Sequence, residues 1–399
     1  MASSLAAERF TGRTLLPSGA VRRVTLTFEG VTLVGVDEPA PGEADLDGLL
    51  IPGLVNAHTH LELSDVGLVP GGHGLPAWVR AQMQARRTRD RASSEGALQE
   101  SILRLMDYGT SAVCDVAGGA TTAPALLAAG LSGVVQRERL GQDPTRAEQG
   151  AAEAVALFQH HQSGATVVVE RPTAHAPYST HPDLARAVLA RRDGWAAPAT
   201  IHLAEDPAEL QFLHDASGPF AALLTDFGVR WAPLDRAYTP MEWLASVSEL
   251  SGAVAAVHGV ELTADELSYM AKTGTAIVLC ARSNLHIGGK PPPVASMLAA
   301  GVPLALGTDG LVSCPDLDVL GEVVALCGVA PEVPVSVWLH MATRGGAQML
   351  GFDQLGAFEL GSHPGLVQLD TDEPGLRVAA PDRRWLVRAG VPSSQWSPS

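Results

Sequence analysis

Basic residues are scarce in this sequence. Its 399 residues include 27 lysines and arginines against 43 aspartates and glutamates, which gives a formal net charge of −16 at pH 7. Proteins that bind nucleic acids or anionic membranes carry stretches of basic side chains, and none is visible here. We therefore expect neither a nucleic acid nor a membrane as a partner.

Long apolar segments are missing as well. No run reaches about 18 apolar residues, the length that crosses a bilayer as a helix. The first ten residues, MASSLAAERF, contain no apolar core with basic flanks, so we expect no signal peptide. The chain is predicted to be cytoplasmic.

Cysteine is also rare. The four cysteines show no CxxC pair, and they are Cys114, Cys280, Cys314 and Cys327. Two of them, Cys114 and Cys280, lie in strand-like apolar runs, where a small buried thiol is the usual role. The scattered spacing favours reduced thiols over a disulfide framework.

The sequence does contain a regular alternation of apolar runs and helical stretches after residue 51. The eight apolar runs cover residues 53–58, 110–116, 132–138, 166–175, 199–205, 253–259, 275–282 and 302–309. The helical stretches include residues 75–90, 97–109, 145–161, 181–192, 206–216, 263–274 and 293–301. Apolar strands joined by helical crossovers are typical of a buried parallel sheet. Eight such units over roughly 290 residues predict an α/β protein with a (β/α)8 TIM barrel.

The two ends of the chain have a different pattern. Residues 12–50 alternate short β-like runs with turn residues, and short β runs return after residue 343. We therefore expect a small β-sandwich domain made from residues 1–51 and 343–399, beside a barrel of residues 52–342. Residues 218–240 fit neither pattern and are expected to form a lid or an irregular excursion after the fifth strand.

Histidines and acids recur where the apolar strands stop. His58 and His60 end the first strand, and their spacing of two turns both side chains to the same side of it. Catalytic residues of such barrels lie at the carboxyl ends of the strands. Four later strands end in the same way, with His175, with His202 followed by Glu205, with His258 and with Asp309.

These strand-end residues predict a metal site. A lone histidine at a strand end is more often a satisfied, partly buried side chain than a ligand. Three imidazoles and one carboxylate, however, form a ligand set suited to a divalent metal such as Zn²⁺ or Fe²⁺. The order HxH, HxxE, H and D on strands one, five, six and eight favours a metal over separate structural histidines.

The motifs HTHLELS, HAPYST, HLAE, VHG, ARSNLHIG and GTDG resemble the amidohydrolase superfamily, in the branch that deaminates purine-like and triazine rings. Within this branch the sequence is most similar to the aminodeoxyfutalosine deaminases, and the resemblance covers nearly the whole chain. It implies one divalent metal, Zn²⁺ before Fe²⁺, held by His58, His60, His202 and Asp309. The lysine that bridges two metals in binuclear relatives has no counterpart in the fourth strand, VVVERPTAH.

The resemblance also implies a division of catalytic roles. Glu205 would take a proton from the attacking water and deliver it to the ring nitrogen beside the carbon under attack. His258 would orient the attacking oxygen, and Asp309 would accept the remaining proton and pass it to the departing ammonia. The alternative for Glu205 is an acid that is favoured beside a helix N-terminus, in AEDPAEL.

Substrate contacts are expected from residues near the same rim. His175 should reach the ring or the ribose of a nucleoside. Glu62 and Ser64 follow the first two histidines and could bind sugar hydroxyls, although ordinary loop polarity explains them equally well.

Three further residues complete the expected substrate side. Arg137, or Arg139 beside it, could form a bidentate pair with a substrate carboxylate, and the alternative is an ion pair with Glu138 or a neighbouring strand. Trp78 could stack on an aromatic ring or pack in the core. Asn284, after the seventh strand, should brace the rim by hydrogen bonds.

The remaining histidines are not assigned to the site. His160 and His161 are expected to end a polar helix and to be solvated. The others lack partners at a recognisable spacing, and they are His73, His181, His214, His286, His340 and His363.

The leading hypothesis is metal-dependent hydrolytic deamination of the 6-amino group of an adenine nucleoside. The resemblance makes 6-amino-6-deoxyfutalosine, of menaquinone biosynthesis, the preferred substrate. Adenosine, S-adenosylhomocysteine and methylthioadenosine are the alternatives, followed by a triazine or guanine-type ring. A catalytically dead scaffold is the alternative outside enzymes, but such relatives typically lose metal ligands, whereas all four are present here. The resemblance also suggests a homodimer.

Overall fold

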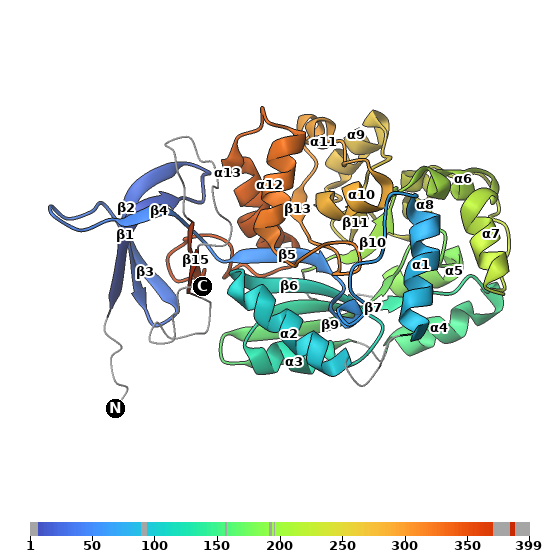
Figure 1. Cartoon of the computed structure of the whole chain (residues 1–399), viewed down its shortest axis with the longest axis horizontal. Helices are drawn as coiled ribbons and strands as arrows, with labels where there is room; N and C mark the ends of the chain where they lie inside the picture. Colours follow the sequence, from blue (N-terminus) through green and yellow to red (C-terminus); the bar gives the residue numbers. More distant parts are fainter. Residues whose placement is uncertain are drawn as a thin grey trace.

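The computed structural model describes residues 7–88, 94–155, 158–190, 194, 196–369 and 384–387. In these residues the chain forms a small sheet at one end and a larger body of strands and helices at the other (Figure 1). The strands that begin and end the described chain both belong to the small sheet. The larger body contains the rim that the sequence predicts to be functional.

The small sheet has six strands, in the order β15-β14-β4-β1-β2-β3. They are β1 (Glu8–Leu15), β2 (Val21–Glu29), β3 (Thr32–Asp37), β4 (Leu46–Ile51), β14 (Leu366–Leu369) and β15 (Arg384–Val387). The described strands pair as one sheet and not as the two facing sheets of the expected sandwich. The region of short β runs predicted after residue 343 extends into residues 370–383 and 388–399, which lie outside the described residues. The division of domains at residues 51 and 343 stays a prediction.

All eight strands predicted for the larger body are present. One parallel set contains β5 (Leu54–Thr59), β6 (Thr110–Ala117), β7 (Ser132–Arg139) and β9 (Thr166–Ala174). A second parallel set contains β10 (Ala199–Leu203), β11 (Val254–His258), β12 (Ile277–Leu279) and β13 (Leu304–Leu306). Nearly every residue of these strands is buried, which explains why they read as unbroken apolar runs.

The two parallel sets contact each other at two places, β9 with β10 and β13 with β5. Between β9 and β10, the Thr173 hydroxyl donates to the Thr200 carbonyl over 2.5 Å. Between β13 and β5, the backbone N–H of Asp309 donates to the His58 carbonyl over 3.1 Å. A Cβ on Gly307 would lie 2.7 Å from the Cβ of His58, so this close approach requires glycine. The eight strands therefore alternate with helices along the chain and are hydrogen-bonded as two separate sheets, and their closure into a barrel stays a prediction.

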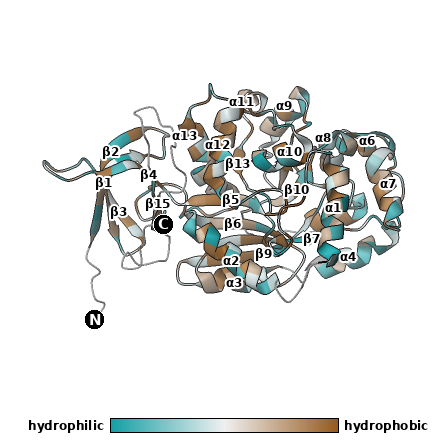
Figure 2. Ribbon diagram, in the orientation of Figure 1, coloured by the Kyte–Doolittle hydropathy of each residue, from teal (hydrophilic) through white to brown (hydrophobic). Residues whose placement is uncertain are grey.

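Helices lie outside the two parallel sheets (Figure 1). They are α1 (Leu75–Thr88), α2 (Ser94–Asp107), α3 (Thr122–Ala129), α4 (Ala147–Val155), α5 (Pro182–Leu189), α6 (Pro207–Asp215), α7 (Gly218–Asp226), α8 (Pro240–Val247), α9 (Ala264–Thr273), α10 (Ala281–Gly288), α11 (Val294–Ala300), α12 (Val319–Val329), α13 (Val335–His340) and α14 (Gly346–Met349). Figure 2 shows apolar strands inside and polar residues on the outer helical surfaces. No helix in the described ranges is both long enough and apolar enough to cross a membrane.

One helix prediction is wrong at its end. The helix expected over residues 145–161 is replaced by α4, which ends at Val155, and by an edge strand, β8 (Gln159–Ser163). His160 and His161 lie on β8, which pairs antiparallel with β9. The open edge of β9 provides backbone partners for this polar segment, and such tertiary pairing outweighs local propensity.

Residues 218–240 are more ordered than an irregular excursion. They begin with α7, whose Phe220 is fully buried and stacks on Tyr178 with ring centroids 3.8 Å apart. Leu223 and Leu224 on α7, and Phe227 after it, face the pocket described below. This segment therefore forms one wall of the candidate site.

Candidate metal centre and active-site pocket

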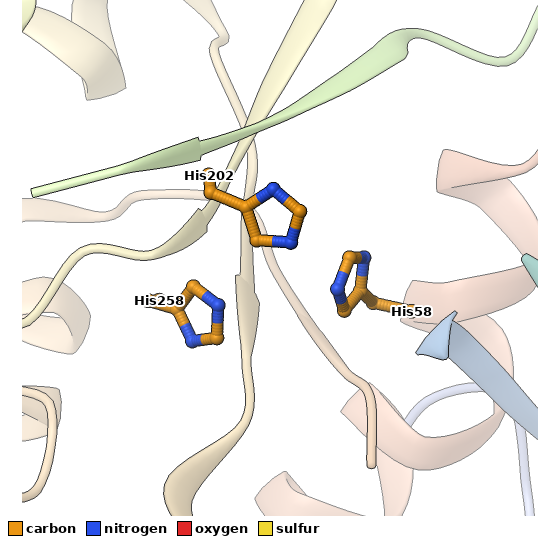
Figure 3. Close-up of side chains that lie close together, drawn as sticks. All are labelled: His58, His202 and His258. Carbon is orange, nitrogen blue, oxygen red and sulfur yellow. The ribbon is translucent and has the colours of Figure 1, made fainter. Parts of the chain in front are cut away.

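The carboxyl ends of the parallel strands bring the predicted residues together. Figure 3 shows His58, His202 and His258, from β5, β10 and β11, with their imidazole rings turned toward a shared space. The backbone bends sharply at three of these strand ends, because Ala204, His258 and Asp309 have φ of 55°, 76° and 57°. Such values are costly for residues other than glycine and cluster at functional sites.

Several of the predicted ligand atoms lie close enough together to share a divalent ion. His60 Nε2 lies 3.3 Å from His202 Nε2 and 3.4 Å from Asp309 Oδ1. His58 Nε2 lies 3.7 Å from the same Asp309 oxygen. Tetrahedral zinc with bonds of about 2.0–2.1 Å holds its ligands roughly 3.3–3.4 Å apart. His58, His60 and Asp309 form one cluster of potential ligand atoms, and His58, His202 and His258 form a second cluster that shares His58.

His58 gives the most direct support for a bound metal. Its ring is fully buried, and neither ring nitrogen has a hydrogen-bond partner among the described residues. Two orphaned imidazole nitrogens are expensive to bury in a folded protein. Coordination of a metal by one of them removes part of that cost.

Backbone carbonyls orient two of the other ligands. His60 Nδ1 lies 3.1 Å from the Val116 carbonyl, and His202 Nδ1 lies 3.0 Å from the His175 carbonyl. A carbonyl can only accept, so each Nδ1 carries the proton and each Nε2 presents its lone pair to the centre. Metal-binding histidines are commonly held in this way.

Burial keeps four of the histidines at this rim neutral. It lowers the pKa of His60 to about 4 and the pKa values of His175 and His258 to about 3. Burial also lowers the pKa of His202 well below its usual range. Neutral imidazole is the form that binds a metal, so these side chains are ready to coordinate at neutral pH.

Asp309 is held in the ionised form. Burial acts to raise its pKa, but the surrounding histidines, His58 first, lower it well below the usual range. The hydroxyls of Ser283 and Ser313 donate to its Oδ2 over 2.7 and 2.6 Å. Its Oδ1 therefore remains available to the histidine cluster.

Glu205 is placed to hold a proton beside this cluster. Its side chain is 6% exposed, and its Oε2 lies 3.6 Å from His258 Nε2. Burial, and then the nearby carboxylates beginning with Asp309, raise the pKa of Glu205 well above its usual range. Asn284 Nδ2 lies 3.0 Å from His258 Nδ1, which fixes that ring from the opposite side.

A cavity of about 400 Å³ opens over these residues. Its floor contains His60, His202, Glu205, His258 and Asp309. Most of its walls are apolar, and they include Leu75, Trp78, Met83, Tyr178, Leu224 and Phe227. A mostly apolar pocket with a few convergent polar groups is the usual form of a small-molecule site.

The predicted substrate residues divide into two groups. Trp78, His175 and Glu62 line the cavity. Ser64 and Arg137 do not line it. The Arg137 guanidinium forms a buried ion pair with Glu170 on β9, 3.2 Å away, which is the neighbouring-strand alternative considered above.

Two features of the site were not found from sequence. Glu138 lines the cavity and shares a cluster of potential ligand atoms with His175 and His202. The alternation of β7 could have indicated it, because Arg137 and Glu138 must face opposite sides. The other feature is the pair of serines on Asp309. The fourth parallel strand, β9, contains no lysine that could bridge two metals. The chain's two lysines are Lys272, on α9, and Lys290, after α10.

The sequence is similar to proteins of known family. Residues 49–387 match the Amidohydrolase family. The chain is 29% identical over 401 residues to a 5-methylthioadenosine/S-adenosylhomocysteine deaminase of Haloarcula marismortui, covering 92% of this chain and 85% of that relative. It is 28% identical over 331 residues to an aminodeoxyfutalosine deaminase of Deinococcus radiodurans, covering 78% and 76%.

Solved structures share the fold at lower identity. Helicobacter pylori aminofutalosine deaminase, in complex with methylthio-coformycin, superposes with a TM-score of 0.73 and 20% identity, over 92% of this chain and 93% of that one. A Xanthomonas campestris adenosine deaminase with bound zinc gives a TM-score of 0.72 and 21% identity, over 96% and 92%. The family match spans both parallel sheets and the metal-fitting rim, and so the chain belongs to the amidohydrolase family and is a hydrolase that acts on carbon–nitrogen bonds.

Proposed function

We propose that this protein is a zinc-dependent deaminase of an adenine nucleoside, which replaces the 6-amino group by oxygen and releases ammonia. The observation that carries the proposal is the set of ligand separations around Asp309 Oδ1 and His60 Nε2, beside the buried acid Glu205. His58, His60, His202 and Asp309 would hold one divalent ion. Such an ion lowers the pKa of water enough for it to attack near neutral pH.

The chain's own residues then move the protons. Glu205, in its ionised form, takes a proton from the attacking water and then donates it to the ring nitrogen beside the carbon under attack, and its raised pKa favours holding the proton between these two transfers. His258 orients the attacking oxygen and is itself fixed by Asn284. Asp309 accepts the second proton and passes it to the departing ammonia. The apolar walls exclude water from the ring.

The finer proposal for the substrate is 6-amino-6-deoxyfutalosine. Its aryl group would suit the apolar wall that contains Trp78, Tyr178 and Phe227. A carboxylate beyond that wall would meet Arg86 at the edge of the cavity, or Arg139 in the adjoining one. The Deinococcus relative named above carries the corresponding name.

Methylthioadenosine and S-adenosylhomocysteine are the second candidates. Several relatives bear that name at 27–29% identity, and the same apolar wall would accept a methylthio group. With each of these substrates, the adenine ring would lie beside Glu205 and the proposed metal ligands.

A substrate panel tests both levels of this proposal. Zinc-loaded protein is mixed separately with aminodeoxyfutalosine, adenosine, methylthioadenosine and S-adenosylhomocysteine, and deamination is followed by the fall in adenine absorbance. The highest kcat/KM is expected for aminodeoxyfutalosine. Higher values for methylthioadenosine or S-adenosylhomocysteine would replace the finer proposal, and no deamination of any adenine nucleoside would contradict the general one.

A further inference from the structure

Glu138 is a carboxylate of the pocket that the proposed mechanism does not use. It lies near the end of β7, and its side chain is 14% exposed. Its Oε1 is buried and has no hydrogen-bond partner in the described part of the chain. The nearest imidazole nitrogens, His175 Nε2 and His202 Nδ1, are 3.8 and 3.9 Å away, which is too far for a hydrogen bond.

The two neighbouring histidines already use their Nδ1 atoms elsewhere. His202 Nδ1 contacts the His175 carbonyl at 3.0 Å, and His175 Nδ1 contacts the Ser179 hydroxyl at 2.5 Å. A buried carboxylate oxygen without a donor costs free energy. A donor that arrives with the substrate would satisfy Glu138.

Glu138 also lies where two cavities adjoin. It lines the cavity of about 400 Å³ that contains Glu205 and the metal ligands, and it lines a second cavity of about 480 Å³. Leu140, Gln142 and Val229 border both cavities as well. If the base of a nucleoside reacts beside Glu205, the sugar attached to that base would lie at the junction of the two cavities.

We propose that Glu138 determines specificity by accepting hydrogen bonds from the vicinal hydroxyls of the substrate's sugar. This inference rests on the proposed function. Two adjacent hydroxyls can each donate a hydrogen bond, and one carboxylate can accept both. Glu62, the other acid considered for this role, already uses one oxygen to accept from the Gly119 backbone N–H at 2.9 Å. Glu138 Oε1 has no such commitment among the described residues.

The test compares adenosine with 2′,3′-dideoxyadenosine on the zinc-loaded protein. The wild type is expected to favour adenosine in kcat/KM by about 10- to 100-fold, the effect of two hydrogen bonds together. Glu138→Ala should lower the adenosine value by a similar factor and change the dideoxyadenosine value by less than about threefold. Glu138→Gln, which keeps one acceptor, should fall between them. Glu100→Gln, the same change on the exposed surface of α2, should alter neither substrate.

Binding gives a second measurement that does not depend on turnover. Inosine and 2′,3′-dideoxyinosine are compared by calorimetry on the same variants, and only inosine should bind more weakly to Glu138→Ala. The inference would be overturned if the wild type had equal kcat/KM for adenosine and 2′,3′-dideoxyadenosine, or if Glu138→Ala lowered both values by the same factor. If Glu138→Ala does not fold, the comparison of the two substrates on Glu138→Gln and on the wild type still tests the inference. Absence of all adenine nucleoside deamination would instead remove the proposed function, and this inference with it.

Discussion

The two carboxylate oxygens of Asp309 have different neighbours. Oδ1 faces His58 and His60, whereas Oδ2 accepts from the hydroxyls of Ser283 and Ser313. Both serines are fully buried, so these hydrogen bonds are shielded from water. They fix the rotation of the carboxylate and leave one oxygen for a metal.

Removal of both hydroxyls should therefore weaken metal binding. Partners of this kind typically contribute 10- to 100-fold in metal affinity, and we expect a loss of about that size in the Ser283→Ala/Ser313→Ala double variant. Zinc affinity is measured by competition with a chromophoric chelator. Ser362→Ala is the matched control, because that buried serine also makes two hydrogen bonds but lies beside the small sheet. An unchanged affinity in the double variant would show that Asp309 needs no such support.

Glu205 allows a sharper separation of chemistry from binding. Glu205→Gln keeps the shape of the side chain but cannot take up a proton, so kcat should fall by about 10²- to 10⁴-fold. Zinc content should stay at the wild-type value, because Glu205 is not among the proposed ligands. Turnover near the wild-type level, with normal zinc, would assign the proton transfer to another residue.

At the scale of single residues, the sequence predicted the clustering of the strand-end side chains better than their surroundings, and their role as metal ligands stays a proposal. His58, His60, His202 and Asp309 lie directly at strand ends, where chain position fixes direction. Arg137 could not be placed in the same way, because its partner Glu170 is 33 residues away and the pairing depends on the register of β7 and β9. Glu138 was overlooked although the alternation of β7 could have indicated it.

At the scale of elements, α6 supports the end of β10. Glu209, in the first turn of α6, accepts from the backbone N–H groups of Ala204 and Glu205 over 2.8 and 3.2 Å. Ala204 is one of the residues with positive φ, so Glu209 holds the bend that presents Glu205. Burial raises the pKa of Glu209 to about 8, although these two hydrogen bonds act in the opposite direction.

This raised pKa predicts a pH-dependent stability. A carboxyl whose pKa is higher in the folded protein stabilises the fold below its unfolded pKa of about 4.5, and this contribution is lost as the pH rises through about 8. Glu209→Gln stays neutral throughout. Its free energy of unfolding, relative to the wild type, should therefore increase between about pH 4.5 and 8, by at most about 1.4 kcal/mol per pH unit. Urea titrations at several pH values measure this difference, with Glu100→Gln as the control, and a constant difference would contradict the role of Glu209.

The elements that the sequence predicted are those with a strong local signal. Most of the eight buried strands are predominantly apolar because both faces are covered. Thr263 begins α9 through a reciprocal pair of hydrogen bonds with Glu266, as the spacing of the two residues indicates. β8 has no such signal. Its residues QHHQS are polar on both faces, and only the open edge of β9 makes them a strand.

At the scale of the whole molecule, the site is assembled from distant parts of the chain. Its metal-fitting side chains come from β5, β10 and the segment after β13, while its walls come from α1 and α7. The order of strands could be predicted from the sequence, because right-handed β–α–β units leave few alternatives. The walls could not be predicted, because α7 lies in a segment without a clear pattern and its place depends on the stacking of Phe220 on Tyr178.

The central claim is that four side chains from three parts of the chain share one metal ion. Anomalous diffraction at the zinc absorption edge, from crystals of the zinc-loaded protein, tests it most directly. One peak is predicted, about 2.0–2.2 Å from His58 Nε2, His60 Nε2, His202 Nε2 and Asp309 Oδ1. No peak among these atoms, or a peak that two or more of them do not reach, would contradict the account.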